Sequence, residues 1–189
     1  MGQMMEKLKS QRPSILLRIT LICLCLPLLM WSCAPVPPIP DHRESGGAAE
    51  LRWDSNGITL TAFLEYAPPS DQAPRDMTLR FSFPSAWKDV TLSRQNGVLR
   101  CTFEGTETDG SPFAPLLKAA ELFLSEGELR YVCKTKLFGK DHLYAEIRSE
   151  ERDTDPIAIW YDPETLCPKQ VSGKGLTLTV LSLGRYTQK

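Results

Sequence analysis

The sequence has little of the chemistry that enzymes and metal sites need. Only two histidines, His42 and His142, occur among its 189 residues, too few for a histidine-based metal cluster. The sequence contains no Gly-x-Ser-x-Gly elbow, phosphate-binding loop or dinucleotide fingerprint. Asp141 precedes His142, but the pair falls in a predicted hairpin turn and no nucleophile motif accompanies it. We therefore expect no catalysis.

The chain also lacks a marked excess of charge of either sign. Its formal net charge is −1, and without the first 33 residues it keeps 18 basic and 22 acidic side chains. This balance gives no basic footprint for nucleic acid. The acidic stretch 149–155 lacks the glycine and the ligand spacing of a calcium loop, so we expect a solvated turn there and no metal or cofactor.

No apolar run in the sequence reaches the length of a membrane span. Residues 19–31 form an apolar stretch of 13, whereas a spanning helix needs about 20. Basic residues precede the stretch and Cys33 follows it. This order resembles a bacterial lipoprotein signal, which implies that residues 1–32 are removed and that Cys33 becomes the lipidated first residue. The resemblance places the protein outside the cytoplasm, anchored to the cell membrane by acyl chains such as palmitate.

Two other interpretations of this segment remain open. The first is an uncleaved signal anchor, for which the apolar stretch is short. The second is ordinary cleavage after Ala34, which would leave Pro35 directly behind the cut. Met30 and Trp31 differ from the leucine and the small residue that usually stand three and two places before the lipidated cysteine.

Residues 34–50 have the composition of a spacer. Four prolines favour extended polyproline geometry, and Gly46-Gly47 restores flexibility. The predicted organisation is therefore a signal in 1–32, a lipidated cysteine and tether in 33–50, and one domain in 51–189.

The domain holds three cysteines, an odd number that allows at most one internal disulfide. Cys101 and Cys133 align with apolar residues of their predicted strands, so we expect both to be small buried hydrophobic residues. The third, Cys167, follows a predicted turn.

Most of the domain alternates between apolar and polar residues with a period of two, which predicts strands. Asn96-Gly97 is a strong hairpin signal between two of them. Nine strands are predicted: 58–66, 77–83, 88–94, 98–104, 129–138, 142–149, 157–161, 170–173 and 176–183.

One segment has helical periodicity instead. Ser111-Pro112 is a typical helix start, and Gly127 supplies a terminating residue. The apolar residues between them fall on a broad helical face. We therefore predict an α+β, mainly β fold in which a curved antiparallel sheet, a half-barrel of about nine strands, wraps around one central helix. The apolar face consists of Phe113, Leu116, Leu117, Ala120 and Leu124.

The segment 157–168 resembles the strand-turn-strand of LolA-like lipoprotein-carrier domains. In that family a strand ends in an Asp-x-x-Thr-x-x-Pro turn, and here Asp162, Thr165 and Pro168 occupy those places. Asp and Thr side chains bond turn N–H groups, and proline stiffens the entry to the next strand. The resemblance covers 51–189, although the family's N-terminal helix has no counterpart because the tether runs almost directly into the first strand.

The resemblance implies two functions. In the first, the domain binds a lipid or an acyl chain in an apolar half-barrel. In the second, akin to some spore-germination lipoproteins, it is a scaffold that positions an envelope or spore-cortex enzyme, with Trp87 or Trp160 as a partner anchor. Core packing is the alternative role for all of these side chains. The cavity residues expected for the first function are Leu79, Phe81, Phe103 and Phe113.

Overall fold

The computed structural model describes residues 38–55, 57–70, 73–149 and 155–185. Residues Ile39–Lys189 form one compact unit, and the architecture given below is that of this unit. The predicted signal, Cys33 and the first part of the predicted spacer lie outside the described residues.

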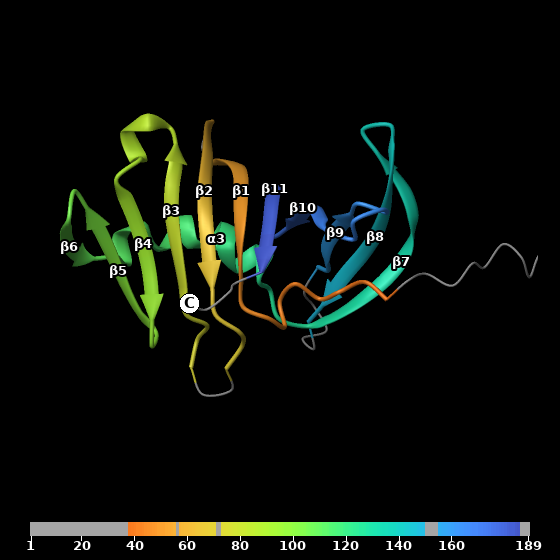
Figure 1. The fold of residues 1–189 in the computed structure, drawn as a ribbon, viewed down its shortest axis with the longest axis horizontal. Helices are drawn as coiled ribbons and strands as arrows, with labels where there is room; N and C mark the ends of the chain where they lie inside the picture. Colours follow the sequence, from red (N-terminus) through yellow and green to blue (C-terminus); the bar gives the residue numbers. More distant parts are fainter. Residues whose placement is uncertain (1–37, 56, 71–72, 150–154, 186–189) are drawn as a thin grey trace, which may run out of the picture. The chain divides into compact units, whose positions relative to one another are not determined.

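An antiparallel sheet of eleven strands dominates the unit (Figure 1), in the order β6-β5-β4-β3-β2-β1-β11-β10-β9-β8-β7. The prediction of a curved, mainly antiparallel β fold with one helix is confirmed, with two more strands than the pattern indicated. The strands are β1 (Gly47–Ser55), β2 (Ile58–Tyr66), β3 (Met77–Phe83), β4 (Val90–Gln95), β5 (Val98–Phe103), β6 (Thr106–Asp109), β7 (Glu128–Leu137), β8 (Lys140–Arg148), β9 (Ile157–Tyr161), β10 (Pro168–Gly173) and β11 (Leu176–Arg185).

The two additional strands are β1 and β6. β1 occupies the middle of the sheet, where it pairs with β2 on one side and β11 on the other. The domain boundary predicted at residue 51 therefore lies inside a strand. β6 is fully exposed and lies at the edge of the sheet beside β5, so its sequence carries no alternation of apolar residues that would have marked it.

The sequence predicts Gly47 as part of a flexible spacer, but Gly47 is the first residue of β1 and packs closely against Tyr66. A β-carbon added there would lie 2.7 Å from the hydroxyl oxygen of Tyr66. Glycine at this position lets the β1 backbone approach the Tyr66 ring, and the predicted spacer contributes its residues from 39 onward to the domain.

The helix forms where it was predicted, as a short 3-10 turn η2 (Ser111–Phe113) followed by α3 (Ala114–Phe123), and α3 lies across the inner face of the sheet (Figure 1). Ser111 does not cap it as predicted. Instead, the Ser111 N–H and hydroxyl both donate to the Asp109 carboxylate, at 3.1 and 2.7 Å. α3 buries its apolar face against the sheet with Leu117, Ala119, Ala120, Leu122 and Phe123.

The turn after β9 is built as its sequence predicts. Asp162 Oδ1 accepts hydrogen bonds from the N–H groups of Glu164 and Thr165, at 3.0 and 2.9 Å. Thr165 Oγ1 accepts one from the Cys167 N–H at 3.4 Å. The N–H of Thr165 is the main cause that holds the pKa of Asp162 below its ordinary value.

The cysteines follow the prediction only in part. Cys101 is buried as expected, whereas Cys133 is exposed, and both have free thiols, as does Cys167. The prediction for Cys133 is wrong because a bulge between Tyr131 and Cys133 shifts the register of β7 by one residue. A shift of one residue moves a side chain to the opposite face of a sheet.

We expect Phe123→Ala to be strongly destabilising. The Phe123 ring is fully buried in the core, so its removal should lower the free energy of unfolding by about 3–5 kcal/mol. Urea denaturation of the two proteins measures the difference. Phe103→Ala removes the same ring from a site that is 47% exposed and should change stability by no more than about 0.5 kcal/mol. Equal losses in the two variants would contradict the placement of α3 in the core.

Candidate functional site

The four residues predicted to line an apolar cavity occupy three different environments. Leu79 and Phe81 are buried in the core between the sheet and α3. Phe113 is partly buried and meets the Trp87 ring edge-on, with ring centroids 6.5 Å apart. Phe103 is exposed at the end of β5. The four side chains therefore differ in how far solvent reaches them.

A hollow of about 520 Å³ lies beside α3, where the helix meets the turn between β10 and β11. We call it the α3 hollow. Lys118 and Lys174 contribute basic groups to it. Its size falls within the range of about 300–1,000 Å³ that is usual for small-molecule sites. Its apolar lining consists of Trp53, Pro115, Ala119, Leu122 and Leu176.

The elements around the α3 hollow explain why apolar side chains line it. Trp53 points inward from β1 and packs against Phe81, with ring centroids 6.2 Å apart. Ala119 is small, so α3 leaves room beside the Trp53 ring. Lys118 is exposed on the helix next to Ala119, and its stem can cover apolar surface while its ammonium group stays in water.

A second hollow, of about 410 Å³, shares Glu121 and Lys174 with the first. Its lining is mostly polar and carries both signs of charge. Glu121 accepts a salt bridge from Arg94 at 2.9 Å. This mixture favours neither an anion nor a cation.

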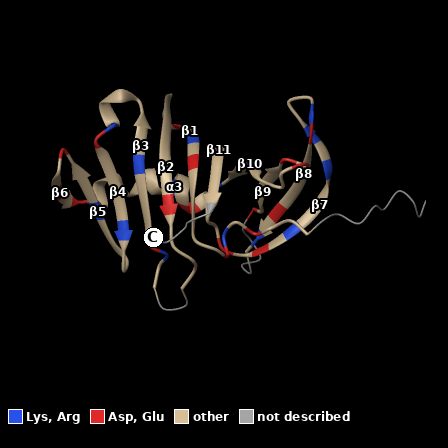
Figure 2. Cartoon of the chain, in the orientation of Figure 1, with Lys and Arg blue, Asp and Glu red and all other residues tan. Residues whose placement is uncertain are grey.

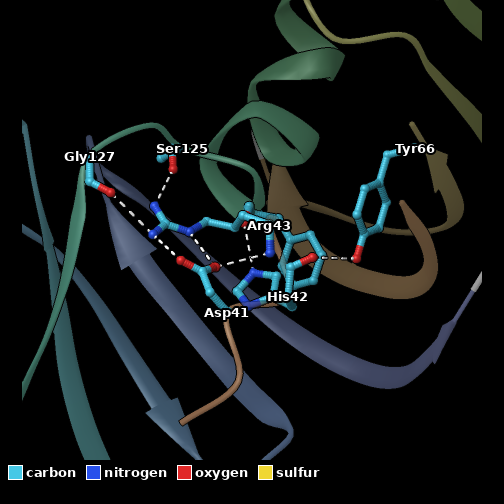
Figure 3. A network of polar contacts seen from close by, with 7 residues as sticks. Asp41, His42, Arg43, Tyr66, Ser125 and Gly127 are labelled. Carbon is cyan, nitrogen blue, oxygen red and sulfur yellow. Dashed lines mark hydrogen bonds and ion pairs between the residues drawn. The ribbon is translucent and has the colours of Figure 1, made fainter. Parts of the chain in front are cut away.

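A buried polar network joins residues 41–43 to the carboxyl end of α3 (Figure 3). Arg43 holds the Asp41 carboxylate with two hydrogen bonds, 2.8 Å from Nε and 2.5 Å from Nη2. The same guanidinium donates to the carbonyl oxygens of Ser125 at 2.6 Å and Gly127 at 3.1 Å. Both carbonyls belong to the segment between α3 and β7, so Arg43 satisfies backbone groups that neither the helix nor the strand pairs.

His42 completes this network. Its Nε2–H donates to the Phe123 carbonyl oxygen at 3.0 Å, and its ring lies 4.4 Å from the Phe123 ring centroid. The Tyr66 hydroxyl donates to the His42 carbonyl oxygen at 3.0 Å. Sequence analysis placed His42 in the tether, but its side chain is buried. No periodic pattern marks these residues, so the sequence offers no signal for their burial.

Burial governs the protonation of this network. It lowers the pKa of His42 to about 4 and raises the pKa of Tyr66 to about 12. Burial also acts to raise the pKa of Asp41, but the hydrogen bonds and charge of Arg43 outweigh it and hold that pKa below its ordinary value. His42 is therefore neutral between two ionised neighbours. Its Nδ1 is buried and has no hydrogen-bond partner among the described residues.

The other residues that the sequence singled out lie apart from the α3 hollow. His142 is half-buried and its Nδ1 lies 2.9 Å from the Lys140 carbonyl oxygen, next to an exposed Asp141. Trp160 is half-buried against Tyr144, and Trp87 packs on Phe81. Most of the acidic stretch 149–155 lies outside the described residues.

The described residues contain neither a metal-binding cluster nor a membrane-spanning helix. Within the described ranges, no group of three or more His, Cys, Asp or Glu side chains is arranged to hold a metal ion. In the same part of the chain, no helix has the length and apolar character needed to cross a membrane.

No protein-family model matches the chain, and no curated protein matches its sequence. Several solved structures resemble it at a distance. An uncharacterized conserved protein from Thermus thermophilus has a TM-score of 0.46 at 12% identity, over 80% of this chain and 85% of that one. An outer membrane lipoprotein-sorting protein domain from Vibrio parahaemolyticus has a TM-score of 0.36 at 11% identity, over 77% and 87%.

The complex of MucA and MucB from Pseudomonas aeruginosa contains another similar chain. Its TM-score is 0.40 at 14% identity, over 78% of this chain and 55% of that one. This chain therefore spans about half the length of the matched protein. All three likenesses are distant, and none identifies a ligand, a partner or a family for this chain.

The pKa of His42 predicts loss of stability in mild acid. The folded pKa of about 4 lies below the ordinary value of 6.5, so the unfolded chain binds more protons between these two pH values. Stability should be complete above pH 6.5 and fall toward pH 4, by on the order of 3 kcal/mol, on top of the carboxylate background.

Urea denaturation between pH 4 and 8 measures this slope. His42→Asn removes the titrating group and should flatten it, whereas the matched variant His142→Asn, which changes the other histidine, should keep it. A slope that both variants keep would assign the acid sensitivity to other groups.

Proposed function

We propose that this protein is a non-catalytic domain held outside the cytoplasm by a lipid on Cys33, and that it binds a lipid or a single acyl chain in the α3 hollow. The observation that carries the proposal is the α3 hollow itself, a space between helix and sheet. Its lining combines an apolar wall with Lys118, Lys174 and Glu121, and Glu121 is paired with Arg94. An acyl chain would lie along the apolar wall, and Lys118 and Lys174 suit an anionic carboxylate or phosphate head.

This site differs from the cavity that the sequence suggested. Of the four residues suggested, Phe81 packs against the Trp53 ring that lines the site, and Leu79 is buried in the core. The space is limited to about 520 Å³, since α3 covers the inner face of the sheet beside it. A single chain therefore fits this site better than a whole diacyl lipid.

The anchor is the first part of the proposal to test. Cells grown with radioactive palmitate should label the wild-type protein, and Cys33→Ala should remain unlabelled because it lacks the acceptor thiol. Cys25→Ala serves as the matched control, since Cys25 belongs to the segment that is removed, and it should label normally. Label that persists in Cys33→Ala would place the anchor elsewhere.

The α3 hollow makes a separate prediction. Leu176→Trp fills the hollow from β11 and should weaken binding of a fluorescent fatty acid by about tenfold, which corresponds to the loss of about 1.4 kcal/mol of apolar contact. Leu181→Trp places the same ring on the same strand at a site that is 40% exposed and should bind normally. Native mass spectrometry of the gently extracted wild-type protein should also show a co-purifying lipid.

A second candidate function is the scaffold that positions an envelope or spore-cortex enzyme. The observation in its favour is a set of exposed apolar side chains at one end of the sheet, Ile58, Phe83 and Phe103, which are 54%, 53% and 47% exposed. Exposed apolar residues grouped on a surface are typical of protein-binding sites. Three results would favour the scaffold. Mass spectrometry would show protein without bound lipid, the two tryptophan variants would bind the fatty acid equally, and a single stoichiometric partner would be recovered from membranes.

A further inference from the structure

The hairpin of β7 and β8 stands out from the rest of the sheet (Figure 1). Pairing between β8 and β9 ends at Leu143 and Tyr161, whereas pairing between β7 and β8 continues for three more residue pairs. At about 3.4 Å per residue, the hairpin projects roughly 10 Å past its neighbour. Phe138 at its tip is 89% exposed, more than any other large hydrophobic side chain among the described residues.

Phe138 is an unusual residue type for the backbone conformation that it adopts. Among the described residues, four hairpins close with two residues that both have positive φ, a geometry that favours Asn-Gly or Asp-Gly. Three of them place a polar residue first, and the fourth places Phe138, at φ 49°. The left-handed region disfavours a bulky side chain, so the aromatic ring is held there against local preference. The three polar turns are Asn96-Gly97, Glu104-Gly105 and Lys174-Gly175.

Three lysines lie close to Phe138 in the sequence. Lys134, Lys136 and Lys140 are all exposed within six residues of the tip, and Figure 2 shows basic residues along β7 up to the turn. The projecting part, residues 135–142, holds Lys136 and Lys140, and Lys134 directly precedes it. Asp141 is the one carboxylate in this part, and it pairs with Lys136 in the strand register. His142 is half-buried and directed to the Lys140 carbonyl. The tip thus combines an exposed aromatic ring with a net positive charge.

We infer that the tip of the β7–β8 hairpin binds the surface of an anionic lipid bilayer, with Phe138 in the interfacial layer and the three lysines on the lipid phosphates. Phe, like Trp and Leu, forms the apolar face that membrane-surface helices bury at the boundary between headgroups and acyl chains. Each lysine close to an anionic surface raises the affinity for that surface about fivefold. A narrow projecting tip can enter the headgroup layer of a bilayer, because lipids rearrange around it. The tip shares no residue with the α3 hollow.

The test uses the unit Ile39–Lys189, which contains the whole described core, and vesicles of equal parts phosphatidylglycerol and phosphatidylcholine. The wild-type unit should sediment with these vesicles, less so in high salt, and stay free of pure phosphatidylcholine vesicles. Phe138→Asn should bind about tenfold more weakly, while its melting temperature should stay equal or rise because asparagine suits the turn.

Two further variants sharpen the test. The triple variant K134Q/K136Q/K140Q should bind on the order of 100-fold more weakly. Phe103→Asn removes an exposed ring beside the Glu104-Gly105 turn and should bind vesicles like the wild type. Leu176→Trp should also bind vesicles like the wild type, so that vesicle binding is tested independently of ligand binding in the α3 hollow. The inference is overturned if the wild-type unit ignores anionic vesicles, binds neutral ones equally, loses as much with Phe103→Asn, or uses Phe138 to hold a soluble protein instead.

Discussion

The carbonyl groups at the carboxyl end of α3 impose the constraint on which the rest of the structure depends. α3 buries its apolar face against the sheet, so its last turn ends inside the protein, where water does not reach every carbonyl. An unpaired buried carbonyl is costly. His42 supplies a donor to Phe123, the last residue of α3, and Arg43 supplies donors to Ser125 and Gly127 in the segment that follows the helix. The residues just before β1 therefore fasten the helix, and the helix in turn covers the inner face of the sheet.

This arrangement also decides what kind of site the fold can offer. α3 covers the inner face of the sheet, and Leu79 and Phe81 of β3 are buried in the core. What remains open is the edge of the helix, where Ala119 leaves space beside Trp53. A ligand there would touch both the helix and the sheet. The β7–β8 tip is separate from this edge, and the molecule thus presents two surfaces with different chemistry.

Local patterns were sufficient for much of the fold. Alternation in β2 and β3, the Asn96-Gly97 turn and the Asp162 turn all depend on residues close together in sequence, and each forms as predicted. The helix followed from its periodicity for the same reason. The failures depend on how strands pair, which the pattern of a single strand does not encode. Cys133 is exposed because of a bulge that only the pairing of β7 with β8 defines.

The candidate site shows the same division. The sequence by itself determined that apolar side chains would face a helix across a sheet, since side-chain period and helical period are local properties of the chain. Only the tertiary structure decided which of them line an open space, that β1 lies between β2 and β11, and that His42 and Arg43 are buried. These outcomes depend on contacts such as Arg43 with Ser125, which are 82 residues apart. A polar residue in a proline-rich segment carries no local sign of the distant carbonyl that it will meet, because that meeting is set by how the whole chain packs.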